Sequence, residues 1–454
     1  MNLHELDAFV LPKLAEFQTA GASIALIQED RMVDAKGYGF RDVEAVLPYT
    51  AHTNGPIASV TKSFTALAIL MLAENGALSV DDTVNHHLPE FDIQPEAEPI
   101  RIRHLLSHSS GIPSLTSSEM EWAALTGATK TRYPLASHDS LLAYGSNAQQ
   151  WLIAAPGEQM RYCNYGFHLL GAIIERRANM PYEDFITDHI LKPLKMKHSY
   201  FTKTRYEADE DASSAYIISQ GARKKIPMPF RAVTAAGGLF SNGHDLARYL
   251  RMFLNEGQLD ERRILSPAGV QSMTRPHITL PKEGRWHQSS YGFGLMRSDD
   301  FYGQVMMEHG GGLPFATSYI AWIPATGMGV AVLLNGVGYP TWRIAQVALA
   351  LLLQEDWREL PFLRRERRLA ALVGSYSSYR AGLQCTVRLT GDQLFMEQGN
   401  AHQQTSVPLL EEQYSETECQ FVAPMMGERL SLMFKKHPSH IDLHMDRYVF
   451  RKKI

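Results

Sequence analysis

The chain has 454 residues, of which 45% are hydrophobic and 20% are charged, and its formal net charge is −4. These values are typical of a soluble globular protein, and the length predicts two domains, or one large domain with an appendage. The weakly acidic balance contains no basic block and gives no support for a nucleic-acid partner. Three scattered cysteines are too few for a disulfide framework or a metal site, and they favour a reduced, cytoplasmic setting.

The N-terminus has no basic region followed by an apolar stretch, so we expect no signal peptide. Apolar residues recur at helical spacing through residues 2–19 and predict an amphipathic helix. The next two segments, S-I-A-L-I-Q-E-D and M-V-D-A-K-G-Y-G-F, predict two strands joined by a short charged turn. The longest apolar runs fall far short of the eighteen residues of a membrane span, so we expect no membrane partner.

A long, mostly apolar helix is predicted over residues 61–74, and Asn75-Gly76 ends it. A helix that is apolar on nearly all faces is a buried helix. Ser59 and Lys62 stand three residues apart at its start, a spacing that places two side chains on one helical face. Two interpretations of this S-x-x-K pattern are open: an N-cap serine with a solvated lysine, or a nucleophile beside its activating amine.

The rest of the chain divides into two regions with different sequence patterns. Residues 113–160 are rich in Ser, Thr, Ala and Gly and predict a loop-and-helix insertion near a cleft. Regular elements follow: helices at 166–177 and 243–254, strands at 318–323 and 328–334, and a helix at 342–353. Past residue 368, short alternating stretches such as C-T-V-R-L, Q-L-F-M-E, R-L-S-L-M-F and H-I-D-L-H-M predict a small β-barrel or sandwich. We therefore expect a domain at 1–355, a charged linker at 356–368 and a β-barrel domain at 369–454.

Two further motifs could carry chemistry. Tyr162-Cys163-Asn164 is the only Y-x-N, and it lies between the turn signal Pro156-Gly157 and a predicted helix. A tyrosine has an unperturbed pKa of about 10, which a nearby ammonium would lower; otherwise it is a loop tyrosine bonded to backbone. His309 precedes three glycines that would let the backbone approach a ligand and present N–H groups, or would form a flexible turn.

The ordered set of Ser-x-x-K, Tyr-x-Asn and His-x-Gly resembles the pattern of serine β-lactamase-like and penicillin-binding proteins. More closely, the chain resembles the branch of class C β-lactamases, D-Ala-D-Ala carboxypeptidases, D-aminopeptidases and related esterases. The flanking blocks I-R-H-L-L-S-H-S-S-G-I-P (102–113) and A-A-G-G-L-F-S-N-G-H-D-L-A-R (235–248) are similar to that branch. The resemblance covers residues 5–353. It implies an α/β (α+β) domain with an antiparallel sheet flanked by helices and an all-helical subregion, and the C-terminal segment resembles a lipocalin-like barrel.

By this resemblance, Ser59 is the nucleophile of an acyl-enzyme. Lys62 either takes the serine proton itself or, as an ammonium, lowers the pKa of Tyr162. Tyr162 then shuttles the proton to the leaving group and activates water. Asn164 holds the substrate amide and helps to fix Lys62, and the oxyanion hole is formed by the backbone N–H groups of Ser59 and Gly312. The resemblance thus predicts the following site: Ser59, Lys62, Tyr162, Asn164, His309, Gly310, Gly311 and Gly312, with no metal and no organic cofactor.

The third motif departs from the Lys-Thr-Gly of class C β-lactamases. His309 and Gly310 replace a permanent cation and a hydroxyl that helps to bind a substrate carboxylate, so we expect weak or no β-lactamase activity. His-Gly-Gly looks more like D-aminopeptidases and related peptidases or esterases. Cys163 is interpreted as a spacer between Tyr162 and Asn164 rather than as a second nucleophile.

The predicted function is hydrolysis of small peptides, perhaps containing D-residues, with a carboxylesterase and a non-hydrolytic scaffold of the same fold as alternatives. His104 and His108 have the i,i+4 spacing of zinc ligands, but without an H-E-x-x-H motif a structural role is expected. A different serine hydrolase would show G-x-S-x-G, which this chain lacks. Two roles are open for the barrel: restriction of substrate size, or assembly into a homo-oligomer.

Overall fold

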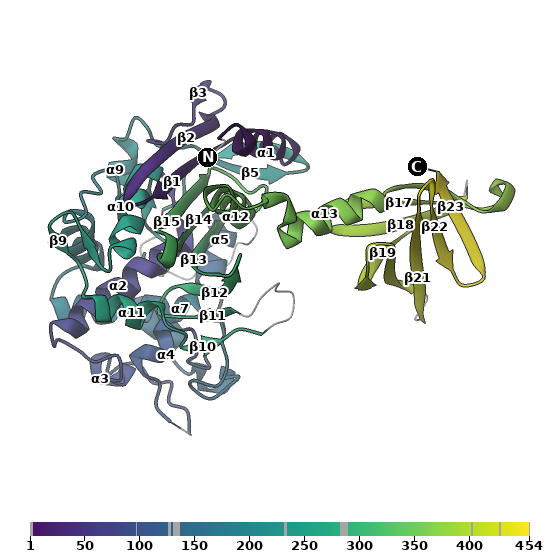
Figure 1. The fold of residues 1–454 in the computed structure, drawn as a ribbon. Coiled ribbons are helices and arrows are strands. Elements are labelled where there is room, and N and C mark those ends of the chain that lie inside the picture. The colour runs from purple at the N-terminus through teal and green to yellow at the C-terminus, as the bar shows by residue number, and fades with distance from the viewer. Residues whose placement is uncertain are drawn as a thin grey trace. The chain divides into compact units, whose positions relative to one another are not determined.

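The computed structural model (Figure 1) describes residues 3–96, 98–125, 129, 137–230, 234–281, 289–400, 403–425 and 428–453. The chain divides into two compact units, Met1–Trp357 and Arg358–Ile454. The helices are α1 Leu3–Glu16, α2 Thr61–Glu74, α3 Val84–His87, α4 Ile102–Leu106, α5 Ser117–Leu125, α6 His138–Gly145, α7 Asn164–Ala178, α8 Tyr182–Ile186, α9 Lys203–Glu207, α10 Gly243–Leu254, α11 Pro267–Thr274, α12 Thr341–Leu352 and α13 Pro361–Leu372. Within the described part of the chain, none of them combines the length and apolar character that a bilayer crossing requires.

The first unit is built on a nine-stranded antiparallel sheet with the order β10-β11-β12-β13-β14-β15-β1-β2-β3. Its strands are β1 Gly21–Gln28, β2 Arg31–Asp42, β3 Leu47–Pro48, β10 Ile278–Thr279, β11 Ser289–Tyr291, β12 Met296–Phe301, β13 Gln304–Leu313, β14 Ala316–Ile323 and β15 Met328–Leu334. The N-terminal hairpin joins the last strand of this unit, with Ala22 opposite Leu334. The predicted flanked sheet is confirmed.

Helices cover the central strands. Helix α12 packs on β14 and β15, and α10 packs on β1, β14 and β15. Strand β1 is buried along almost its whole length, and since successive strand residues point to opposite faces, the two helices cover the two sides. The amphipathic pattern of residues 2–19 forms α1, which packs on α12.

Helix α2 is the buried helix that its apolar sequence predicts, with eleven of its fourteen residues buried. It packs on α7, α8 and α11, and Figure 1 shows α3, α4, α7 and α11 gathered with it below the sheet in this view. The insertion at 113–160 contains α5, α6 and a 3-10 turn, Ala148–Trp151; residues 126–128 and 130–136 of it lie outside the described residues. Short two-stranded pairs complete the unit: β4 Gly55–Pro56 with β7 Phe240–Ser241, β5 Ala215–Ser219 with β6 Ala222–Ile226, and β8 Gln258–Leu259 with β9 Arg262–Arg263.

The second unit contains a closed antiparallel barrel of eight strands in chain order. They are β16 Gly374–Ser377, β17 Gln384–Thr390, β18 Gln393–Asn400, β19 Gln403–Tyr414, β20 Glu418–Met425, β21 Glu428–His437, β22 His440–Met445 and β23 Tyr448–Lys453. Buried apolar side chains such as Tyr376, Val387, Leu432, Phe434 and Leu443 form its core. The four stretches named from sequence are β17, β18, β21 and β22. The charged segment expected as a linker contains a 3-10 turn and the first part of α13.

Candidate active site

Ser59 lies in a 3-10 turn, Ala58–Val60, directly before α2. Its hydroxyl does not cap the helix, because α2 begins after Val60 without a side-chain cap. The Ser59 oxygen instead accepts a hydrogen bond of 3.0 Å from the side-chain nitrogen of Lys62. Ala58 adopts a φ of 47°, in the left-handed region that L-residues rarely use. The N-cap interpretation is therefore wrong, and the strained turn presents Ser59 to Lys62.

Lys62 is fully buried, which contradicts a solvated lysine. Besides Ser59, its nitrogen donates a hydrogen bond of 2.6 Å to the carbonyl oxygen of Ala236, which belongs to the A-A-G-G block singled out in the sequence. The nitrogen also lies 4.9 Å from the ring centroid of Tyr162 and 5.7 Å from that of Phe167. The first two motifs of the predicted site thus meet around one buried amine.

Tyr162 stands two residues before α7 and keeps 39% of its surface exposed. Desolvation nevertheless raises the pKa of its hydroxyl above the usual range, and a hydrogen bond with the Ser59 side chain opposes that rise. The direction is opposite to the one expected if the Lys62 ammonium prepared a phenolate. In this structure the Tyr162 hydroxyl therefore keeps its proton near neutral pH.

The third motif lies inside strand β13, not in a flexible turn. The ring of His309 is buried; its Nδ1 donates to the Gly310 carbonyl oxygen at 2.8 Å, and its Nε2 accepts from the Tyr291 hydroxyl at 2.9 Å. Desolvation and the charge of Lys62 lower the pKa of His309 to about 3, against the smaller effect of the Gly310 hydrogen bond. His309 is therefore neutral and does not replace the cation of a Lys-Thr-Gly motif.

The glycines of β13 run past the turn that holds Ser59. A side-chain carbon at Gly311 would collide with the carbonyl oxygen of Ile57 and with Ser318 Oγ, whereas one at Gly312 would meet open space. Ser318 fixes the same turn, because its hydroxyl donates to the Ile57 carbonyl at 2.6 Å. Close approach of two backbones requires glycine, and here it brings β13 beside Ser59.

Asn164 is the first residue of α7, and its Nδ2 donates to Glu119 Oε1 at 3.2 Å. Cys163 is buried; its backbone N–H donates to His108 Nδ1 at 3.1 Å and its thiol donates to the Pro113 carbonyl at 3.3 Å. Desolvation raises the pKa of Cys163 to about 11, so the thiol stays protonated. This supports the spacer interpretation, since the thiolate is the nucleophilic form.

Sequence reasoning did not identify Tyr291, and it expected only a structural role for His108. The His108 ring lies 4.2 Å from the ring of Tyr162 and 4.9 Å from that of Tyr291, and its φ is 55°. Desolvation, followed by the charges of Lys62 and His309, holds its pKa far below the usual value. The only available signal was its place in the S-H-S-S-G block. His104 Nδ1 instead accepts the Arg101 backbone N–H at 3.2 Å, at the start of α4.

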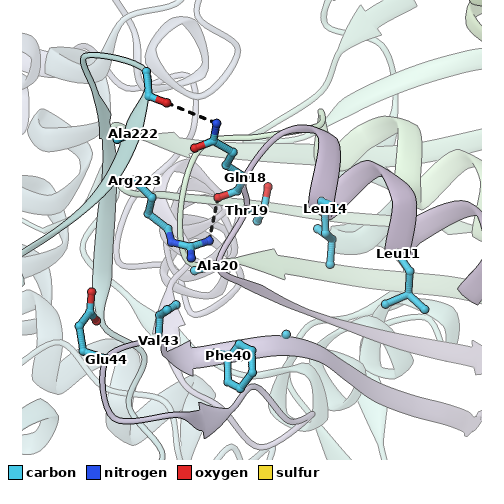
Figure 2. A pocket seen from close by; sticks show the side chains of 13 residues that line it. Leu11, Leu14, Gln18, Thr19, Ala20, Phe40, Val43, Glu44, Ala222 and Arg223 are labelled. Carbon is cyan, nitrogen blue, oxygen red and sulfur yellow. Dashed lines mark hydrogen bonds between the residues drawn. The ribbon is translucent and has the colours of Figure 1, made fainter.

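A separate pocket of about 600 Å3 lies between α1, β2 and the β5–β6 hairpin (Figure 2). Apolar side chains such as Leu11 and Phe40 line it, and Arg223 closes one side by donating to the Gln18 carbonyl at 3.1 Å. Its lining shares no residue with the site around Ser59. Among the described residues, the two groups with metal-ligating geometry, Asp82-His86-His87 and His437-His440-Asp442, also lie outside that site.

Comparison with known proteins agrees with this geometry. Residues 6–354 match the Beta-lactamase family, and residues 357–451 match the Pab87 octamerisation domain. Protein flp of Staphylococcus aureus (strain MW2) is 30% identical over 337 residues, which are 73% of this chain and 62% of flp. The chain thus spans about three fifths of the length of that relative.

Two solved structures are also similar to this chain. The octameric penicillin-binding protein homologue from Pyrococcus abyssi has a TM-score of 0.93 at 36% identity, with 100% of both chains covered. A D-stereospecific amidohydrolase from Streptomyces sp. has a TM-score of 0.64 at 25% identity, over 76% of this chain and 98% of that chain.

Proposed function

The chain belongs to the Beta-lactamase family, a family of serine hydrolases, and we propose that it hydrolyses amide bonds of small peptides through an acyl-enzyme on Ser59. The observation that carries this proposal is the 3.0 Å hydrogen bond between the buried Lys62 amine and the Ser59 hydroxyl. A nucleophile within hydrogen-bond reach of a base is the arrangement that acyl transfer needs. The similarity to a D-stereospecific amidohydrolase supports amides, including those of D-residues, as substrates.

In the proposed acylation, the unprotonated form of Lys62 takes the Ser59 proton while the serine oxygen bonds to the amide carbon. The backbone N–H groups of Ser59 and Gly312 hold the oxyanion. Tyr162, which is protonated at rest, gives its proton to the leaving nitrogen as the C–N bond breaks, and the Lys62 ammonium returns a proton to Tyr162. The amine leaves, and both groups regain their starting forms.

Deacylation follows the same route in reverse. Water attacks the ester carbon, Lys62 accepts a proton from that water, and the departing Ser59 oxygen recovers a proton through Tyr162. The products are the free acid and the resting enzyme. Asn164 holds the substrate amide during acylation, and neutral His309 supports the Gly310–Gly312 strand in both steps through its bonds to Gly310 and Tyr291.

A small apolar pocket next to the turn supports a substrate with a short side chain. Phe230, Phe240, Leu313 and Phe315 line it together with Gly237, and its volume is about 20 Å3. A side-chain carbon at Gly237 would stand 3.5 Å from the backbone of Ala58, the neighbour of the nucleophile. That volume takes one methyl-sized group, which fits alanine better than a large residue.

The experiment is the intact mass of wild type and Ser59→Ala after incubation with a fluorophosphonate, and separately with a penicillin. A fluorophosphonate adduct on wild type alone is the expected result. D-Ala-p-nitroanilide, its L-isomer and p-nitrophenyl esters then compare amide with ester cleavage and D with L substrates. A folded wild-type protein that takes no adduct and cleaves none of these substrates would contradict the proposal and favour a non-hydrolytic scaffold.

We also propose that the chain assembles into a homo-oligomer through its second unit. Two findings support this: residues 357–451 match an octamerisation domain, and the Pyrococcus abyssi homologue is octameric. Native mass spectrometry of the full chain should give a multiple of the 51.0 kDa protomer. A mass of one protomer across the micromolar range would contradict assembly while leaving the hydrolase proposal intact.

A further inference from the structure

A carboxylate stands beside the proposed substrate-binding asparagine. Glu119, in the first turn of α5, accepts two hydrogen bonds at the same oxygen, Oε1: one of 3.2 Å from Asn164 Nδ2 and one of 3.2 Å from the Ser114 hydroxyl. Its side chain is exposed, and no lysine or arginine among the described residues pairs with it. The other carboxylate oxygen, Oε2, takes part in neither bond.

The negative charge of Glu119 reaches the reacting groups. Desolvation is the largest cause of the raised pKa values of Tyr162 and Cys163. The charge of Glu119 is among the further causes that raise both values. The two histidines nearest Lys62, His108 and His309, are both neutral near pH 7 because burial and Lys62 lower their pKa values. Among the groups that shift the pKa values of these site residues are therefore one buried cation, Lys62, and one exposed anion, Glu119.

We propose that Glu119 binds the free α-ammonium group of the substrate, so that the enzyme removes an N-terminal amino acid from a small peptide or amide. This inference rests on the proposed acyl-enzyme function and specifies its substrate class. The α-nitrogen is separated from the scissile carbonyl carbon by one carbon atom, so it must lie close to the groups that hold the acyl portion. Asn164 is one of those groups, and Glu119 is the carboxylate in contact with it.

The same arrangement disfavours other substrates. In the substrates of a carboxypeptidase or an acyl-amino-acid hydrolase, the nitrogen of the acyl portion is acylated and uncharged, so it would leave the Glu119 carboxylate without an ionic partner. Asn164, held through Nδ2 by Glu119, keeps its carbonyl oxygen as the acceptor for a substrate N–H. The charge of Glu119 therefore favours the substrates of an aminopeptidase over those of a carboxypeptidase or an acyl-amino-acid hydrolase.

The test is Glu119→Gln, assayed as the full-length protein on D-Ala-p-nitroanilide and on N-acetyl-D-Ala-p-nitroanilide. Glutamine keeps an oxygen that accepts the Asn164 and Ser114 hydrogen bonds but carries no charge. We expect kcat/KM to fall about tenfold for the free-amine substrate, the size of one lost charge-assisted hydrogen bond, and to change less than twofold for the acetylated one. Glu158→Gln, which alters another exposed, hydrogen-bonded carboxylate, should change neither.

The pH dependence gives a second readout. Because an α-amino group has a pKa of about 8, the wild-type preference for the free-amine substrate should decline above pH 8, and Glu119→Gln should lack that decline. Equal losses on both substrates would overturn the proposal, since they would mean that Glu119 only orients Asn164. A wild type that prefers the acetylated substrate would overturn it too. Labelling of Ser59 by a fluorophosphonate distinguishes these results from failure of the hydrolase proposal itself.

Discussion

The side-chain nitrogen of Lys62 lies 2.6 Å from the carbonyl oxygen of Ala236, across 174 positions of the chain. The neighbouring carbonyl, that of Ala235, accepts the Thr65 hydroxyl one turn further along α2 at 2.7 Å. The A-A-G-G segment is thus attached to α2 by two hydrogen bonds on the face that carries Lys62. This attachment orients the Lys62 amine toward Ser59. It also fixes the part of the A-A-G-G segment that lines the small apolar pocket.

Replacement of Lys62 by methionine should abolish the proposed base while keeping the length and apolar stem of the side chain. We expect kcat on D-Ala-p-nitroanilide to fall by roughly 10²–10⁴, the usual contribution of a positioned base, with a parallel fall in the rate of fluorophosphonate labelling. Lys36→Met removes an exposed lysine that pairs with Asp7 and should leave both rates unchanged. Labelling of Lys62→Met at the wild-type rate would contradict the role of Lys62.

Tyr162→Phe removes only the hydroxyl that we propose as proton donor to the leaving group. An amide nitrogen must be protonated to leave, whereas p-nitrophenolate leaves without a proton. The variant should therefore lose roughly a hundredfold or more in acylation by the anilide and much less in acylation by a p-nitrophenyl ester, both measured as the pre-steady-state phase. Equal losses on the two substrates would mean that Tyr162 acts through Ser59 rather than on the leaving group.

His108→Asn and His108→Phe separate the hydrogen bond of His108 from its ring. Asparagine tolerates the left-handed backbone at this position and keeps an acceptor for the Cys163 N–H, whereas phenylalanine keeps the ring contact with Tyr162 but loses the acceptor. A buried N–H without a partner costs about 1–3 kcal/mol. Urea unfolding should show that the phenylalanine variant is the less stable of the two. The reverse order would show that ring packing outweighs the hydrogen bond.

Gly311→Ala should lower kcat strongly, although the substitution adds only one methyl group. The added carbon would collide with the Ile57 carbonyl, which is backbone, so β13 or the Ser59 turn must move. Displacement of an oxyanion donor costs roughly a hundredfold or more in kcat, which the steady-state rate on the anilide would reveal. Gly329→Ala, in β15 of the same sheet, makes only ordinary contacts at 3.5 Å and should keep wild-type kcat.

The first unit should lose stability in mild acid. The pKa of His309 is about 3 in the folded protein and that of His104 about 4, against the usual 6.5. In both cases desolvation is the largest cause. Between these values and pH 6.5, the two histidines bind protons in the unfolded chain but not in the folded chain. The free energy of unfolding therefore rises with pH across this window and reaches its full value above pH 6.5.

Each histidine contributes at most about 1.4 kcal/mol per pH unit inside the window. The free energy of unfolding in urea, measured between pH 7 and pH 5, should therefore fall, and it should fall less steeply in His309→Gln. Carboxylates with lowered pKa values, such as Asp42 at about 2, lose their contribution only at lower pH, so they do not account for this slope. A flat profile from pH 7 to 5 would contradict the neutral, buried state of His309.

Periodicity and short motifs were enough to predict the regular elements near the site. Helix α10 has the predicted bounds, 243–254, and α2 has the predicted bounds, 61–74. The motif order also indicated that Ser59, Lys62 and Tyr162 belong together. These predictions succeed because helix and strand periodicity depends on neighbours in the chain, and because the spacing of Ser59 and Lys62 is a property of one helical turn.

Other features depend on residues far apart in the sequence, and only the tertiary structure decided them. Glu119 meets Asn164 across 45 positions, and Cys163 meets His108 across 55. The direction of the Tyr162 pKa and the neutrality of His309 follow from desolvation, which is set by packing around the site and not by local sequence. Closure of the barrel likewise rests on the pairing of β16 with β23, at Ser377 and Arg451. The sequence by itself determined which residues are candidates for the chemistry, and packing determined their protonation and their hydrogen-bond partners.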